Sequence, residues 1–220
     1  MTMIIAIDGP AGSGKSTLSR MLARALKLLY IDTGSMYRAV ALATIDAALD
    51  PANADAVTDL AQRVNINLDG DPDSLRVWLE GRDVTERIRE DDITEMSSIV
   101  STIPGVRRAM VARQREIGKR GAVMNGRDIG TVVFPDADIK FFLDAAAPER
   151  AERRFKEDLL VNPDATLAQT FAEITERDRR DSTRADSPLK IAANAIVIDS
   201  TGLSIQSVFE RMMEYVHRNH

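Results

Sequence analysis

A glycine-rich loop near the N-terminus constrains the fold more than any other part of the sequence. Residues 9–16 read Gly-Pro-Ala-Gly-Ser-Gly-Lys-Ser and match the pattern G-x-x-x-x-G-K-[S/T] at every fixed position. An apolar run at residues 3–7 precedes the loop, and from Lys15 onward apolar residues recur at helical spacing. In such a strand–loop–helix unit, backbone N–H groups and the helix N-terminus together bind phosphate. We therefore predict that the chain binds a nucleoside triphosphate at the end of a buried strand.

The residue types of the loop suit this chemistry. Its glycines let successive N–H groups approach a phosphate without a Cβ in the way. Lys15 can reach the β- and γ-phosphates, and the Ser16 hydroxyl can ligate Mg²⁺. A glycine-rich turn with a chance lysine is the other interpretation, which the preceding strand and the following helix disfavour. The predicted ATP-binding residues are Gly9, Pro10, Ala11, Gly12, Ser13, Gly14, Lys15, Ser16 and Thr17, with Ser16 as the metal ligand.

Short apolar runs alternate with helical patterns along the rest of the chain. They lie at residues 28–31, 122–124, 139–143 and 195–198, and an amphipathic helical pattern follows the last of them. Runs of this length are typical of parallel strands that are buried on both faces. Together with the N-terminal run they predict an α/β fold, in which helices flank a doubly wound, five-stranded parallel sheet.

Residues 64–89 break this alternation. Apolar residues occupy every second position on either side of a turn rich in Asp, Gly and Pro, which predicts an antiparallel β hairpin. We expect a third short strand around Val84, and we expect Trp78 and its neighbours in the packing core of this insertion. The chain then divides into a core (residues 1–63 and 90–220), the insertion, and an arginine-rich lid region (residues 150–184).

Composition excludes several classes of function. The chain has no cysteine, and its two histidines, His217 and His220, stand at the C-terminus, so we expect no thiolate nucleophile, histidine metal site or Ser-His-Asp triad. A net charge of −5 and an aromatic content of 5% argue against a nucleic-acid-binding surface. Because we find neither an apolar run of roughly 18 residues nor a signal peptide, we expect a cytoplasmic protein with no membrane partner.

The length and the arginine content favour a small-molecule kinase. The guanine-reading motif Asn-Lys-x-Asp does not occur, which disfavours a GTPase. Alone, residues 150–184 would be interpreted as solvated helices with ion pairs, but beside a phosphate loop they suit a lid that neutralises phosphates and excludes water. Two alternatives stay open: a kinase for another monophosphate or a small metabolite such as a sugar acid, and a non-catalytic, regulatory ATP-binding protein.

Four segments of the chain resemble one family closely, namely residues 9–17, 32–38, 125–137 and 176–184. The third reads Asn-Gly-Arg-Asp-Ile-Gly-Thr-Val-Val-Phe-Pro-Asp-Ala and is far more specific than the phosphate loop. Across its whole length the chain is similar to bacterial cytidylate kinases, which have the P-loop kinase fold. The resemblance implies transfer of the γ-phosphoryl group of ATP to CMP or dCMP with Mg²⁺, as a step in pyrimidine nucleotide metabolism. Nucleotides are then the partners, and we expect a monomer.

The resemblance also implies roles for residues outside the loop. The implied substrate-binding residues are Thr33, Tyr37, Arg38, Ser98, Arg107, Arg127, Asp128, Arg177, Asp181 and Arg184. Among them, Arg38 and Arg127 would bind the acceptor phosphate, whereas Ser98, Arg107 and Asp128 would read the cytosine. The others would line the monophosphate pocket or lie on the lid side, near the ribose and the transferring phosphoryl group. The implied catalytic residues are Lys15, Arg127, Arg177 and Arg184.

One position departs from the family pattern. Asn125 stands where the family commonly has Asp before Gly-Arg-Asp. If that carboxylate supports the metal shell in the family, the role passes in this chain to Asp32, Asp128 or a water molecule. The resemblance does not assign the lid residue between 153 and 166 that contacts phosphate.

Overall fold

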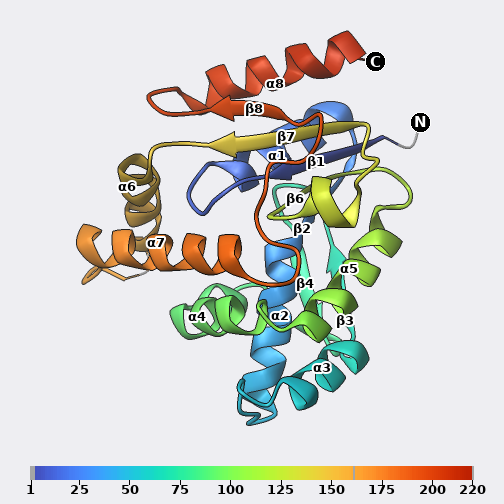
Figure 1. Cartoon of the computed structure of the whole chain (residues 1–220), viewed down its shortest axis with the longest axis vertical. Coiled ribbons are helices and arrows are strands. Elements are labelled where there is room, and N and C mark those ends of the chain that lie inside the picture. Colours follow the sequence, from blue (N-terminus) through green and yellow to red (C-terminus); the bar gives the residue numbers. More distant parts are fainter. Residues whose placement is uncertain (1–2, 161, 220) are drawn as a thin grey trace.

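The predicted apolar runs form one parallel sheet. In the computed structural model, which describes residues 3–160 and 162–219, the strand order is β2-β6-β1-β7-β8 (Figure 1). These strands are β1 (Ile4–Asp8), β2 (Leu29–Asp32), β6 (Ala122–Gly126), β7 (Ile139–Asp144) and β8 (Ile196–Asp199). The predicted runs and the observed strands differ by only one or two residues at their ends. Since all five strands also form one parallel sheet flanked by helices, the predicted fold class is confirmed.

Two helices begin at the same edge of this sheet. Helix α1 (Lys15–Leu26) follows the glycine loop after β1, and helix α2 (Thr33–Asp46) follows β2 directly. The last residues of these strands lie next to β6, because Asp8 is opposite Gly126 and Asp32 is opposite Asn125. The positive ends of two helix dipoles therefore meet at the carboxyl edge of the sheet, where open α/β sheets bind their ligands.

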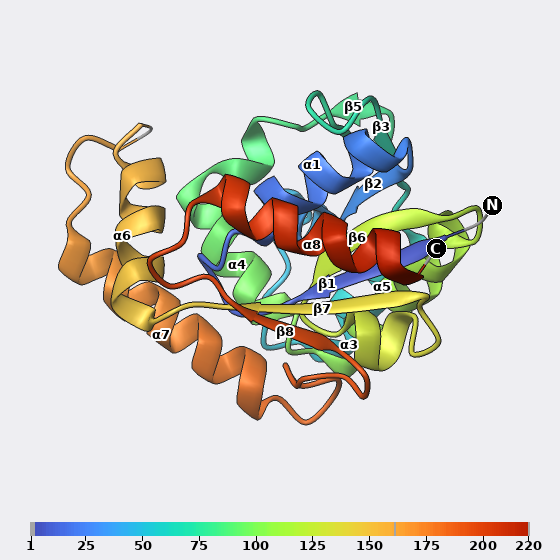
Figure 2. The same cartoon turned by 90° about the horizontal axis from the view of Figure 1, so that it is seen from above.

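Helices cover both faces of the sheet. Those after α2 are α3 (Ala54–Arg63), the short η1 (Arg87–Arg89), α4 (Asp91–Val100), α5 (Pro104–Gly118), the π-helical turn η2 (Ile129–Val133), α6 (Ala147–Asp158), α7 (Leu167–Thr183) and α8 (Ile205–Asn219). On one face α1 and α8 lie side by side (Figure 2). Leu18 of α1 shares a buried cluster with Ile5 and Ile7 of β1. On the other face α5 and η2 pack against Ala6 and Ile31. Burial on both faces explains why the strands are continuous apolar runs.

The predicted antiparallel insertion is present. It consists of β3 (Ile66–Asp69), β4 (Arg76–Leu79) and β5 (Arg82–Asp83), and β4 pairs with both neighbours. The third strand ends one residue before Val84, as expected, but the expectation for Trp78 is wrong. Val77 and Leu79 point into a core shared with α2 and α3, and because side chains alternate along a strand, Trp78 points to the opposite face, where it is half-buried.

Helices α6 and α7 pack against each other and project beside the carboxyl edge of the sheet (Figure 1). They contain most of the predicted lid region. Within residues 3–160 and 162–219, no helix is both long enough and apolar enough to cross a membrane. His217 is exposed near the end of α8, whereas His220 lies outside the described residues.

Candidate active site

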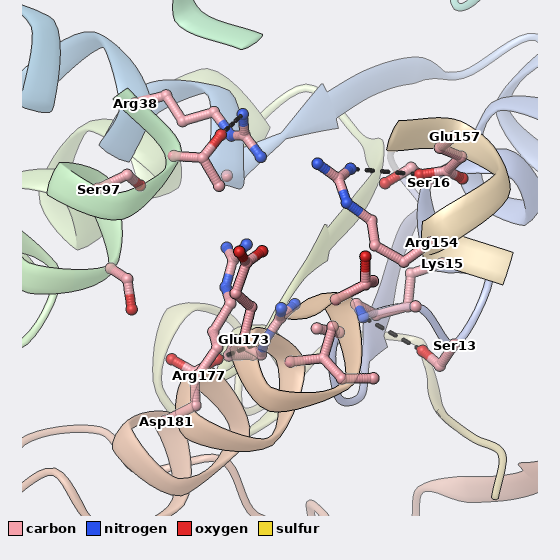
Figure 3. A pocket seen from close by; sticks show the side chains of 18 of the residues that line it. Ser13, Lys15, Ser16, Arg38, Ser97, Arg154, Glu157, Glu173, Arg177 and Asp181 are labelled. Carbon is pink, nitrogen blue, oxygen red and sulfur yellow. Dashed lines mark hydrogen bonds and ion pairs between the residues drawn. The ribbon is translucent and has the colours of Figure 1, made fainter. Parts of the chain in front are cut away.

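A cavity of about 1150 Å³ opens at the carboxyl edge of the sheet. Its walls are the glycine loop, α2, α4, the segment after β6, and the two lid helices. Arg38, Arg154 and Arg177 reach into it from α2, α6 and α7 (Figure 3). Every predicted substrate-binding residue lines this cavity, and so do loop residues 11–17. Its volume is slightly above that of most single-ligand sites, as a cavity for two nucleotides would require.

The glycine loop has the backbone geometry that its sequence predicts. Gly9 has φ +149°, and a Cβ at this position would lie 2.0 Å from the carbonyl oxygen of Leu143. Gly12 has φ +72°, and its Cβ would lie 2.6 Å from the carbonyl oxygen of Arg150. Both positions therefore require glycine. Gly9 and Pro10 shape the loop from behind, since they do not belong to the cavity wall.

Lys15 is held inside this loop. Its Nζ donates to the carbonyl oxygen of Pro10 and to Ser13 Oγ, the latter at 3.2 Å. Burial lowers the pKa of Lys15 well below its usual value, and the nearby charges of Arg127 and Arg177 lower it further. Burial, followed by the charge of Arg127, also lowers the pKa of Arg177 to about 9. Three cations, one buried and two partly buried, are thus crowded together, which favours the binding of a highly charged anion.

The predicted phosphate-binding arginines are oriented by neighbours. Nη1 of Arg38 donates to Thr94 Oγ1 at 2.7 Å and to the carbonyl oxygen of Ile88 at 3.1 Å, which ties α2 to α4 and η1. Nε of Arg127 donates to Asp181 at 2.8 Å. Burial raises the pKa of Asp181, but the charges of Arg127, Arg177 and Arg184 more than offset this effect, so the pKa lies below its usual value.

The residues predicted to read the cytosine lie at the other end of the cavity. Arg107 and Asp128 form a buried ion pair, and the Arg107 guanidinium also lies 5.3 Å from the ring centre of Tyr37. Burial raises the pKa of Tyr37 to about 12. Nη2 of Arg184 lies 3.9 Å from the other carboxylate oxygen of Asp128. Ser98 Oγ accepts from Arg180 at 3.0 Å, so the hydroxyl predicted to read the base is already engaged on one side.

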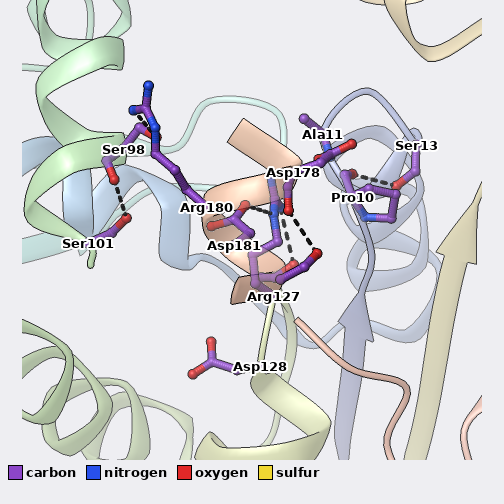
Figure 4. Close-up of polar contacts among 12 residues, drawn as sticks. Pro10, Ala11, Ser13, Ser98, Ser101, Arg127, Asp128, Asp178, Arg180 and Asp181 are labelled. Carbon is purple, nitrogen blue, oxygen red and sulfur yellow. Dashed lines mark hydrogen bonds and ion pairs between the residues drawn. The ribbon is translucent and has the colours of Figure 1, made fainter. Parts of the chain in front are cut away.

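Helix α7 contacts three separate parts of the site, and most of these contacts were not expected from the sequence. Asp178 accepts from the backbone N–H of Ala11 at 3.0 Å, Arg180 donates to Ser98 on α4, and Asp181 accepts from Arg127 (Figure 4). The predicted lid arginines therefore divide into two groups. Arg179 has an exposed side chain that pairs with Glu176, as in the ion-paired interpretation, whereas Arg177 faces the cavity.

Asp8 supports the site from outside the cavity wall, a role that sequence reasoning missed. It is buried, and its carboxylate accepts from the N–H groups of Ile129 at 2.8 Å and Gly130 at 2.7 Å. Burial raises its pKa to about 6. These bonds hold the turn that follows Asp128. The only signal in the sequence was position, because Asp8 directly precedes the phosphate loop.

The residues around Ser16 fit a hydrated Mg²⁺ ion. Asn125 Nδ2 donates to Ser16 Oγ at 3.2 Å, while Asn125 Oδ1 is buried and has no hydrogen-bond partner among the described residues. Asp32 is committed as the N-cap of α2, where it accepts from Gly34 N and Ser35 Oγ. The described residues include no cluster of three or more His, Cys, Asp or Glu suited to a metal ion. A hydroxyl and an amide oxygen, with phosphate oxygens and waters, are ligands that Mg²⁺ accepts.

Comparison with known proteins agrees with this geometry. The family model described as cytidylate kinase matches residues 5–218. A cytidylate kinase of Solibacter usitatus is 49% identical over 217 residues, which cover 97% of this chain and 92% of the relative. One from Desulforamulus reducens is also 49% identical and covers 97% and 96%. The crystal structure of an uncharacterized protein from Eubacterium ventriosum superposes with a TM-score of 0.57, 13% identity and 99% coverage of both chains, which shows a shared fold.

Proposed function

This chain belongs to the cytidylate kinase family, and from that premise we propose that it transfers the γ-phosphoryl group of ATP to CMP or dCMP, giving ADP and CDP or dCDP. One observation carries the proposal. A single cavity joins a phosphate loop containing Lys15, a group of arginines, and a buried Arg107–Asp128 pair beside Tyr37. These three parts match the three chemical parts of the reacting complex, namely the triphosphate, the acceptor phosphate and the cytosine.

On the donor side, we propose that the loop amides and Lys15 bind the β- and γ-phosphates of ATP. The negative charge of the phosphates offsets the repulsion that Lys15 experiences from Arg127 and Arg177, so these cations bind the triphosphate strongly. Mg²⁺ would be held by Ser16 Oγ with Asn125 Oδ1 nearby, directly or through water, and when bound it supplies positive charge to the phosphate oxygens. A carboxylate at position 125 is then not required.

On the acceptor side, the chain's task is alignment. The attacking atom is a phosphate oxygen of CMP, which is already an anion at neutral pH, so no general base is needed. We propose that Arg38 and Arg127 hold that phosphate, that Arg177 and Arg184 act from the lid side, and that Asp181 orients Arg127. Arg154 is the best candidate for the lid cation that contacts phosphate, because it reaches into the cavity from α6 (Figure 3).

At the base end, hydrogen-bond complementarity selects cytosine. Cytosine has an amino donor at N4 beside acceptors at N3 and O2. Uracil has an acceptor, O4, in place of the amino group and a donor, N3–H, in place of the N3 acceptor. Asp128 and Ser98 can accept from the amino group, and Arg107 can donate to N3 or O2. With uracil, buried groups would be left unpaired at a cost of about 1–3 kcal/mol each.

We also propose that the protein acts as a monomer in the cytoplasm, without nucleic-acid partners. Residues of one chain line the whole cavity, from the phosphate loop to the base end. The net charge of −5 gives no general attraction to nucleic acids. Light scattering of the purified protein, with and without nucleotides, tests the oligomeric state.

A substrate panel tests the proposed reaction. Labelled ATP is offered with CMP, dCMP, UMP or AMP, and Lys15→Ala serves as the inactive control. We expect transfer to CMP and dCMP far above ATP hydrolysis, with much less transfer to UMP and AMP. Preferential transfer to another monophosphate, or to a small metabolite, would show that CMP is not the substrate. ATP binding without transfer to any acceptor would favour a regulatory ATP-binding protein.

A further inference from the structure

A buried ion pair between the two lid helices binds both backbone groups of one phosphate-loop residue. Arg150, in the first turns of α6, donates through Nη1 to the carbonyl oxygen of Ala11 at 2.9 Å. Asp178, on α7, accepts from the N–H of Ala11 at 3.0 Å. The same Nη1 atom of Arg150 also donates to the other carboxylate oxygen of Asp178. Ala11, Arg150 and Asp178 thus form a closed set of contacts, in which Asp178 lies beside Ala11 (Figure 4).

The surroundings of Ala11 are closely packed as well. Its methyl group belongs to a small buried cluster with Ala151 of α6 and Ile174 of α7. The next residue, Gly12, has no room for a Cβ because the Arg150 carbonyl oxygen would lie 2.6 Å away. At Ala11 the phosphate loop therefore contacts the lid helices through three groups of one residue, namely the methyl side chain, the N–H group and the carbonyl group.

The chemistry of the pair indicates more than filling of space. The side chains of Arg150 and Asp178 are only 9% and 18% exposed, and removing two charges from water costs free energy that apolar residues of the same size would not incur. Arg150 also binds a second backbone oxygen, since its Nε donates to the carbonyl oxygen of Ala145 at 2.9 Å. The pair therefore joins the phosphate loop, the connection after β7 and both lid helices.

We propose that Arg150 and Asp178 are positioning residues for ATP. They fix the orientation of the Ala11 peptide groups, and with it the direction in which the following N–H groups of the loop face the phosphates. They also fix the parts of α6 and α7 that contact the phosphate loop, so that a closure of the lid would move only the parts of these helices that lie farther from the loop. This inference rests on the proposed function for its ligand, and it adds two residues to those expected from the sequence.

The test uses a double variant in which both charges are replaced by uncharged, apolar side chains that are no larger than the originals, Arg150→Met with Asp178→Ala. Removing both partners of a buried pair avoids leaving one charge unpaired, so the variant is expected to fold. We expect calorimetry to show Mg·ATP binding weakened at least about tenfold and CMP binding changed by less than about twofold. Asp178→Asn keeps an oxygen acceptor for the Ala11 N–H and should lie between the double variant and the wild type. Arg179→Ala, next in sequence but exposed and paired with Glu176, is the matched control and should bind both nucleotides as the wild type does.

Wild-type ATP affinity in a folded double variant would overturn the proposal, because the pair would then serve packing alone. If the double variant does not fold, Arg150→Lys decides the question. An ammonium keeps the charge opposite Asp178, but its single nitrogen cannot reproduce the contacts that Nε and Nη1 of Arg150 make to Ala145 and Ala11 from two separate positions. Unchanged Mg·ATP affinity in that variant would equally overturn the proposal. Because ATP binding is measured directly, a wild type that binds ATP but does not phosphorylate CMP would refute the proposed function and leave this inference standing.

Discussion

Nη2 of Arg107 lies 2.5 Å from Oδ2 of Asp128, and the two side chains are only 2% and 5% exposed. These are two of the residues that we expect to recognise the cytosine. The sequence suggested that each would meet the base separately, but the structure pairs them with each other. Asp128 therefore has one oxygen committed to Arg107, and substitution of Asp128 leaves Arg107 buried without its carboxylate partner.

Asp128→Asn tests base recognition with the least disturbance. The amide keeps the volume of the carboxylate but cannot serve equally as an acceptor for the cytosine amino group, so kcat/KM for CMP should fall more than kcat/KM for UMP. We expect their ratio to narrow by about tenfold or more. Asp128→Ala should narrow it too, but with a loss of stability of about 3–5 kcal/mol because Arg107 is left unpaired. If the ratio of kcat/KM for CMP to kcat/KM for UMP is unchanged in Asp128→Asn, residues other than Asp128 recognise the base.

Lys15→Ala should separate activity from stability. We expect kcat to fall at least about 100-fold, which corresponds to about 2.7 kcal/mol of lost charge stabilisation in the transition state. Because burial and neighbouring cations lower the pKa of Lys15, its charged form is disfavoured in the folded protein, and its removal should not lower the melting temperature. The measurements are steady-state kinetics and thermal unfolding of the ligand-free protein. Turnover of CMP near the wild-type rate would exclude the assigned role of the phosphate loop.

ATP binding should take up a proton at alkaline pH. Burial, Arg127 and Arg177 lower the pKa of Lys15, and the triphosphate raises it again, so the lysine gains a proton between the two values. At about pH 8 to 9 the phosphate groups, with a pKa of about 6, do not contribute to proton uptake. ATP affinity should therefore weaken as pH rises from the lowered pKa of Lys15 in the free protein towards the higher pKa in the complex. Calorimetry in two buffers of different ionisation enthalpy measures the uptake, which should be absent in Lys15→Ala. Equal uptake in that variant would assign the proton to another group.

The lid helices should become protected when both nucleotides are bound. Arg154 and Arg177 carry like charges toward the same cavity, and phosphates from both substrates relieve their repulsion. Hydrogen exchange should slow in α6 and the first half of α7 on addition of a bisubstrate analogue, and much less with ATP or CMP alone. Equal exchange with and without the analogue would support solvated, ion-paired helices that do not close.

The sequence was sufficient for the elements whose physical signal is local. The strands are apolar runs because both faces are buried, and the loop from Gly9 to Ser16 is readable because each fixed position has a backbone or charge requirement. Trp78 was misplaced because the alternation of a strand does not say which face is inside. The pairing of Arg107 with Asp128, and of Arg150 with Asp178, joins residues far apart in the chain. Which arginine meets which carboxylate depends on how the helices pack. The arginine-rich composition alone therefore could not distinguish the ion-paired Arg107 and Arg150 from Arg177, which faces the cavity.

Three contacts to different parts of the site come from Asp178, Arg180 and Asp181, within little more than one turn of α7. Each residue added to or removed from an α-helix rotates everything beyond it by about 100°. If one residue is inserted in the first half of α7, the helix can bulge at that point, and Asp181 then keeps its contact with Arg127. Without a bulge, the insertion would move the side chains of Asp178, Arg180 and Asp181 away from their partners together. Evolution of the lid is therefore expected to vary the connection between α6 and α7 in length, while the stretch from Ile174 to Arg184 keeps its residue count.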